Sequence, residues 1–270
     1  MVTATKPRKP KLEPVGKPET HELRALVEMY YDIQKFRKAG QQRDNPLMKA
    51  ERLEMAVAML KDLEGFLVKE MATVLPEHPV SDWLLGVRGI GPTMAAALLA
   101  SGLDPAIDKP SAWWRFAGVG VVDGKNQRLR RGQKRSYNGF LRRTLYVLMG
   151  QFLKAHTTDK PSFYADLYYR FKEESERDRP EANRMACPGT KAGSKKVACE
   201  GAGCSRCGGT GIVATKLHHH ARAVMLTQRV FLTHLQEVWR RAVGLGPPRN
   251  LYIVEKEPGL HEAIRVPEKG

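Results

Sequence analysis

Four cysteines crowded into one short segment give the clearest chemical signal in this 270-residue chain. They are Cys187, Cys199, Cys204 and Cys207, and the last two form a Cys-x-x-Cys loop. Such a loop supplies two soft sulfur ligands, and four thiolates complete a tetrahedral zinc site with no open position for catalysis. We therefore expect a structural Zn²⁺ ion; unligated thiols in a flexible insertion are the alternative. The crowding fits a reducing, cytoplasmic setting better than a secreted disulfide framework.

Three consecutive histidines, residues 218–220, follow the cysteine segment. Neighbouring side chains on a helix point in different directions, so at most one or two of them could share a metal ion. We expect a solvated polar face at the start of a helix, with a substitute metal ligand as the alternative.

A Gly-x-Gly turn at Gly89 and Gly91 is the second signal. Apolar residues precede it and a run of small residues, 94–99, follows it, which predicts a helix-hairpin-helix. Glycine permits backbone angles that a Cβ forbids, and its bare backbone lets a phosphate approach the N–H groups that begin the next helix. An ordinary tight turn between two helices is the alternative.

The charge of the chain points to the same kind of ligand. The net charge is +16, from 45 Lys and Arg against 29 Asp and Glu, and residues 109–154 hold eleven of the bases and one acid, Asp123. A balance this basic favours a polyanionic partner, most simply nucleic acid; an inert basic surface is the alternative. The expected nucleic-acid contacts are Arg88, Gly89, Gly91, Thr93, Lys125, Arg128, Arg130, Arg131, Lys134, Arg135, Arg142 and Arg143.

Apolar periodicity predicts a mainly α fold to position these groups. Apolar residues recur at three- and four-residue steps, close to heptad spacing, at Leu53, Val57, Leu60, Leu63, Leu67 and Met71. This spacing indicates an antiparallel helical hairpin that acts as a spacer or as a dimerisation arm. No apolar run is long enough to span a membrane. The expected parts are a disordered basic tail (1–20), an antiparallel helical arm (21–79), a helix-hairpin-helix domain with a small glycine-rich loop region (80–183), a four-cysteine zinc-knuckle insertion (184–214), a C-terminal helix (215–246) and a second tail (247–270).

Motifs between residues 80 and 155 resemble the C-terminal domain of the IS one-ten group of insertion-sequence transposases. They are Gly86-Val87-Arg88-Gly89-Ile90-Gly91-Pro92, the small-residue run 95–100, Phe116-Ala117-Gly118-Val119-Gly120, Gly132-Gln133-Lys134 with Asn138, and Leu141-Arg142-Arg143-Thr144-Leu145. The resemblance implies a DNA-binding domain that in those enzymes supplies a serine nucleophile for strand transfer and works with a RuvC-like nuclease domain.

The chain departs from that pattern at both catalytic elements. Where the serine is expected the loop holds Asp123, and Ser136 is the only serine between Ser111 and Ser162. Only two helices are expected before the shared region, without the acidic metal ligands of a RuvC-like domain. We therefore expect a DNA-binding protein without independent catalysis. The alternatives are an active transposase or recombinase that uses Ser136 or Asp123 with a partner nuclease, and a non-enzymatic assembly protein that binds structured RNA.

Overall fold

The structure is a computed structural model. It describes residues 18–43, 51–122, 125–127, 129, 131–178, 184–192, 195–199, 204–205, 207–214, 217–248 and 266–267. The described part is mainly helical, as expected, with only short strands. Asp123, Arg128, Arg130 and most of both expected tails lie outside it. Among the described helices, none has the length and apolar character that crossing a membrane requires.

The chain folds as two units, residues 1–81 with 91–103 and residues 82–90 with 104–270. The first unit contains α1 (Pro18–Arg43), α2 (Glu51–Val74), the short 3₁₀ helix η1 (Leu75–Glu77) and α4 (Pro92–Leu99). The second contains most of α3 (Ser81–Gly86), then α5 (Pro110–Phe116), β1 (Val121–Val122), β2 (Lys125–Asn126), α6 (Gly139–Ala155), α7 (Phe163–Asp178), β3 (Arg184–Ala186), β4 (Thr190–Ala192), β5 (Lys195–Val197), β6 (Ile212–Ala214) and α8 (Leu217–Ala242).

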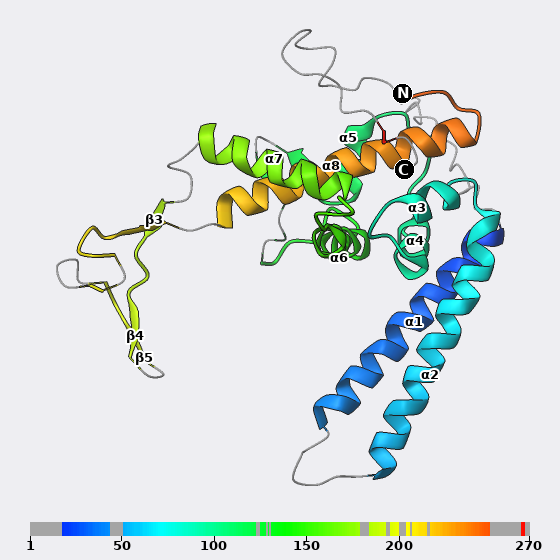
Figure 1. The fold of residues 1–270 in the computed structure, drawn as a ribbon, viewed down its shortest axis with the longest axis horizontal. Helices are drawn as coiled ribbons and strands as arrows, with labels where there is room; N and C mark the ends of the chain where they lie inside the picture. Colours follow the sequence, from blue (N-terminus) through cyan, green and yellow to red (C-terminus); the bar gives the residue numbers. More distant parts are fainter. Residues whose placement is uncertain are drawn as a thin grey trace, which may run out of the picture. The chain divides into compact units, whose positions relative to one another are not determined.

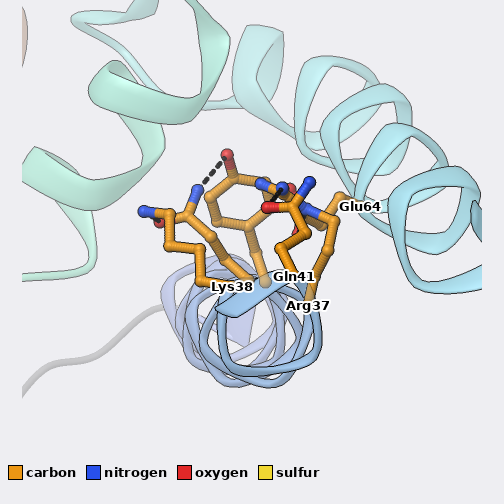
Figure 2. Close-up of polar contacts among 6 residues, drawn as sticks. Arg37, Lys38, Gln41 and Glu64 are labelled. Atoms are coloured by element: carbon orange, nitrogen blue, oxygen red, sulfur yellow. Dashed lines mark hydrogen bonds and ion pairs between the residues drawn. The ribbon is translucent and has the colours of Figure 1, made fainter. Parts of the chain in front are cut away.

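In the first unit α1 and α2 lie side by side (Figure 1). An ion pair within their seam sets the register: Arg37 donates from Nε to Oε1 of Glu64 at 2.6 Å and from Nη2 to Oε2 at 3.2 Å (Figure 2). Three residues further along α1, Gly40 approaches Val57, seven residues earlier in α2. The two helices are therefore antiparallel, and an alanine at Gly40 would bring its Cβ to 2.9 Å from Val57.

The short helix α4 closes this unit against both long helices. Pro92 occupies its first turn, where proline loses no helical hydrogen bond. Residues 95–99 of α4 are all buried. Because most of these side chains are alanine, the backbone of α4 can approach α1 and α2 closely.

The second unit is built around α8, the most buried of its helices, which contacts α5, α6 and α7. Phe231 of α8 is fully buried, and Trp83, Phe152 and Tyr164 pack against its ring. A second aromatic contact joins α5 to α8, with the rings of Trp113 and Trp239 edge to face at 6.0 Å. Trp113 is 1% exposed and therefore belongs to the core of this unit.

The helix α6 carries Arg142 and Arg143 of the predicted interface, and a side-chain cap defines its first turn. Asn138 accepts hydrogen bonds from the amides of Phe140 and Leu141 at 2.9 and 3.0 Å. This cap satisfies two of the backbone donors that a helix start leaves open. The apolar residues of α6 recur at three- and four-residue steps and are buried, so its basic residues are directed to the outer and lateral faces.

Candidate metal centre and nucleic-acid interface

The cysteine segment is closed at its base by two strands that are distant in the sequence. β3 pairs antiparallel with β6, and beside this pair the amide of Cys187 donates to the carbonyl of Gly211 at 2.8 Å. The β4–β5 hairpin then precedes Cys199. Strand pairing therefore returns the first cysteine to the loop that holds Cys204 and Cys207, although 16 residues separate Cys187 from Cys204 in the chain.

The four thiols form one cluster in which all sulfur atoms lie within 4.8 Å of one another. Two sulfur–sulfur distances are 3.8 Å, between Cys187 and Cys204, and 3.6 Å, between Cys199 and Cys207. Zinc–thiolate bonds of about 2.3 Å in a tetrahedron place the sulfurs about 3.8 Å apart. These distances are too long for disulfides and suit four ligands around one ion, so the cluster can hold a metal.

Glycines in this loop turn backbone donors toward the sulfur atoms. Gly208, Gly209 and Gly211 all have positive φ, between +58° and +88°, a region that side chains with a Cβ disfavour. Burial alone would raise the pKa of Cys207, but hydrogen bonds from the backbone of Gly211 and Gly209 and from Cys199 outweigh it and lower that pKa to about 7. Burial raises the pKa of Cys187. The environment therefore favours the thiolate at Cys207, the form that binds metal.

The histidines at the start of α8 pack against α7. Nδ1 of His219 lies 2.8 Å from the hydroxyl of Ser175, and Nδ1 of His220 lies 2.7 Å from the hydroxyl of Tyr168. The expectation of a solvated face is wrong for His219, which is 2% exposed. Among the described residues the metal-binding group consists of the four cysteines without a histidine.

The Gly-x-Gly turn has the conformation that the sequence suggested at its first glycine. Gly89 has a φ of +99°, and a Cβ there would contact the Gln151 carbonyl and the Phe152 ring of α6 at 3.2 Å. Gly91 is exposed and caps α4. Pro92 has no N–H, and the amides of Met94 and Ala95 both donate to the Gly91 carbonyl. Thr93 therefore contributes the first-turn amide of α4 that these bonds leave available to an anion.

Arg88 makes a specific contact within the second unit. Its Nε donates to the carbonyl of Ala155 at 2.6 Å. Ala155 is the last residue of α6, where helices leave carbonyls without partners and favour a positive charge. This contact holds the turn against α6, and it assigns a structural hydrogen bond to a residue that the sequence suggested for phosphate binding.

Basic residues gather between β2 and the first turns of α6. Arg131, Lys134, Arg135 and Arg143 are all exposed. Within the described residues, no carboxylate forms an ion pair with any of them, whereas Arg24, Arg170 and Arg241 elsewhere each pair with a glutamate four residues away. We call Arg131, Lys134, Arg135 and Arg143 the basic loop surface. Lys125 lies in β2, and its side chain is outside the described part.

Tyr137 organises the inner edge of this surface. The guanidinium groups of Arg142 and Arg135 lie 4.8 and 5.8 Å from the centre of its ring. Nη1 of Arg142 also donates to the Gln127 carbonyl at 2.8 Å, so this half-buried residue ties the β-hairpin to α6. Gly118, whose φ is +75°, lies directly beside the Tyr137 ring, and a Cβ at this position would be 2.6 Å from a ring carbon. The packed ring of Tyr137 therefore positions the arginine side chains at this edge of the basic loop surface.

Ser136 lies at the same edge, and the hydrogen bond that its side chain makes with a described residue comes from Gln127. Its hydroxyl accepts a hydrogen bond from the side-chain amide of Gln127 at 3.4 Å. An activated serine needs a neighbouring base to take its proton. None of the described acids or histidines forms a hydrogen bond with Ser136, and Asp123 lies outside the described residues.

Sequence reasoning did not identify Arg229 of α8. Its Nε donates to the carbonyl of Val119 at 2.6 Å, and its guanidinium faces the ring of Trp114 at 5.8 Å. Burial, together with the charge of Arg222, lowers its pKa. Its Nη2 is buried and has no hydrogen-bond partner in the described part of the chain. Arg229 joins the segment after α5 to α8, and the aromatic residue Trp114 was the only sequence signal of this contact.

Neither models of known protein families nor curated proteins match this chain.

Proposed function

We propose that the chain binds the sugar-phosphate backbone of DNA through the basic loop surface. The observation that carries the proposal is the concentration of exposed cations without carboxylate partners at Arg131, Lys134, Arg135 and Arg143, in a stretch almost free of acids. Several cations elsewhere on the surface, Arg24, Arg170 and Arg241, each pair with a glutamate four residues away. Cations that lack such neighbours can neutralise phosphates and release the counterions of DNA.

The packing around Tyr137 supports this proposal because it fixes where the charges are presented. Arg142 and Arg135 are directed by the ring, and the Asn138 cap fixes the first turn of α6 beneath them. Contacts to phosphate set position and affinity, whereas base contacts set sequence preference. The proposed activity is therefore backbone binding with weak sequence preference. In the first unit, the exposed Gly91 and the Thr93 amide at the start of α4 are a separate candidate for one phosphate contact.

The surroundings of Ser136 favour binding without strand transfer. A hydrogen bond from an amide does not remove the proton of a serine hydroxyl, so the described site lacks the base that the covalent reaction needs. The resemblance of motifs in residues 80–155 to those of insertion-sequence transposases supports DNA as the ligand. An active recombinase that works with a partner nuclease, and a protein that reads the shape of structured RNA, are the competing functions.

The test is a salt titration of binding by the full chain. Fluorescence anisotropy would be measured with duplex DNA, branched DNA and double-stranded RNA of equal length. We expect the DNA affinity to fall linearly on a double-logarithmic plot against salt, by about 0.9 per phosphate contact. A flat response would refute the proposal. Tighter binding of RNA would favour the RNA function, and a covalent adduct lost in Ser136→Ala would favour the recombinase.

We also propose that the cysteine cluster holds one structural Zn²⁺ ion. Four thiolates at sulfur–sulfur distances of 3.6 and 3.8 Å fit a closed tetrahedral site, which leaves no position for a substrate. The ion would hold the β3–β6 strand pair and the Cys204–Cys207 loop together. Elemental analysis should give one zinc per chain, and Cys204→Ser should lower that ratio where Ser205→Ala does not. A value near zero in metal-retaining buffer would overturn this assignment.

A further inference from the structure

The helical arm, α1 with α2, exposes a second apolar stripe beside the one that joins its two helices. Met55, Met59, Leu63 and Phe66 follow one another on α2 at steps of four, four and three residues. On α1, Met29 and Phe36 are seven residues apart. All six side chains are between 41% and 67% exposed. We call these six residues the apolar arm face.

A groove between the two helices adjoins this face. Phe36 and Gly40 of α1 and Leu53 and Val57 of α2 line it, and its volume is about 410 Å³. Phe36 belongs to both the groove and the stripe, and Ala56, which also lines the groove, lies three residues before Met59, so groove and stripe are adjacent on α2. The close approach at Gly40 and the Arg37–Glu64 ion pair fix the register of the two helices, so they hold this surface in one arrangement (Figure 2).

We propose that a second copy of this chain covers the apolar arm face, so that two arms form a four-helix bundle. The stripes repeat at the same three-, four- and seven-residue steps as the inner seam, which is the spacing that packs helices against helices in bundles. Two copies related by a twofold axis can pack the same face against each other, so no other partner is needed. A two-helix hairpin alone has no means to enclose this second stripe.

The charge of the arm supports a second copy over a polyanion. Together α1 and α2 carry eight Lys and Arg against nine Asp and Glu, whereas the whole chain has a net charge of +16. Two copies therefore meet without net repulsion, and neither nucleic acid nor an anionic lipid surface is attracted to the arm. Large side chains of roughly 200 Å² each, about half exposed, offer on the order of 600 Å² per copy. A standard interface buries roughly 800 Å² per partner, so the face is of the right size.

The test is sedimentation equilibrium of the full chain, freed of nucleic acid by nuclease and high salt. Wild type should sediment at twice the chain mass. Met59→Glu places a charge in the centre of the proposed interface on both copies and should weaken dimerisation on the order of a hundredfold. Ala58→Glu is the matched control: Ala58 is exposed and lies between Glu54 and Lys61, one turn away on either side, and its change should leave the dimer intact.

Two results would overturn the proposal: a wild-type monomer at every concentration, or a Met59→Glu protein that sediments as the wild type does. Circular dichroism would show whether Met59→Glu keeps its helices. Should it not, Phe66→Gln at the other end of the stripe repeats the test with an uncharged side chain. Because the sedimentation sample contains no nucleic acid, a negative result would contradict dimerisation and would leave the DNA-binding proposal to its own test.

Discussion

Removing three charges from the basic loop surface tests the DNA-binding proposal most directly. Arg131, Lys134 and Arg143 are exposed, and none forms an ion pair with another of the described residues. Changing all three to glutamine should therefore leave the stability of the fold within about 0.5 kcal/mol of wild type. Any change in affinity then reports lost contacts to DNA.

The size of the effect follows from the number of charges. Each lost phosphate contact lowers the slope of log affinity against log salt by about 0.9, so three contacts lower it by about 2.7. Between about 50 and 200 mM salt, the wild-type affinity should consequently fall roughly fortyfold more than that of the variant. The difference should be largest at low salt and should vanish as salt rises, because only the counterion term has been altered.

A control of equal net charge separates local contact from the overall field. Lys38, Lys61 and Lys69 are exposed cations of the arm, and their change to glutamine removes the same three charges. Anisotropy titrations at four or more salt concentrations would give both slopes. We expect the arm variant to keep the wild-type slope within experimental error. Equal slopes for the loop variant and wild type, or an equal reduction in both variants, would refute the assignment of the surface.

Further predictions concern the packing and the chemistry around these sites. Gly118→Ala should lower the free energy of unfolding by at least ~1 kcal/mol more than Gly132→Ala, because both positions have positive φ but only the first Cβ meets the Tyr137 ring; urea unfolding measures both. Burial raises the pKa of Tyr164 well above 10.0 in the fold. The stability that this group contributes should be full below about pH 10 and fall as the pH rises further, by at most ~1.4 kcal/mol per pH unit. Because burial also raises the pKa of Tyr30 and Tyr168, Tyr164→Phe should make the total fall shallower without abolishing it. In metal-free protein, alkylation of Cys207 should have its midpoint near pH 7 rather than near 9.0, and bound metal should suppress it.

Elements that depend on local spacing could be predicted from the sequence. The long helices follow from apolar residues at three- and four-residue steps, and the start of α6 follows from Asn138, a residue type that caps helices. The convergence of the four cysteines was predictable because a Cys-x-x-Cys loop presents two ligands together and glycines with positive φ follow it. For the helices, the cap and the Cys204–Cys207 pair the deciding interactions lie within a few residues in the chain, whereas Cys187 reaches that pair through the pairing of β3 with β6.

The roles of individual polar residues could not be predicted, because they depend on partners far away in the sequence. Arg88 donates to a carbonyl 67 residues later, and Arg229 to one 110 residues earlier. The buried His219 forms a hydrogen bond with Ser175, which lies 44 residues before it. A basic side chain that binds a phosphate and one that binds a helix end have the same local sequence signal, so only the tertiary contacts distinguish Arg88 from Arg143.

The distribution of charge connects the two proposals. The arm is almost neutral although it belongs to a strongly basic chain, and it exposes a stripe of large apolar side chains; the loop before α6 is strongly basic, and its exposed side chains lack acidic neighbours. A protein that used its whole surface for one kind of partner would not need an apolar, neutral arm beside a strongly basic loop. It is expected when one part contacts protein and another contacts a polyanion. Pairing through the arm would also tether a second basic loop surface to the first, and binding by two linked surfaces raises the apparent affinity without any new contact.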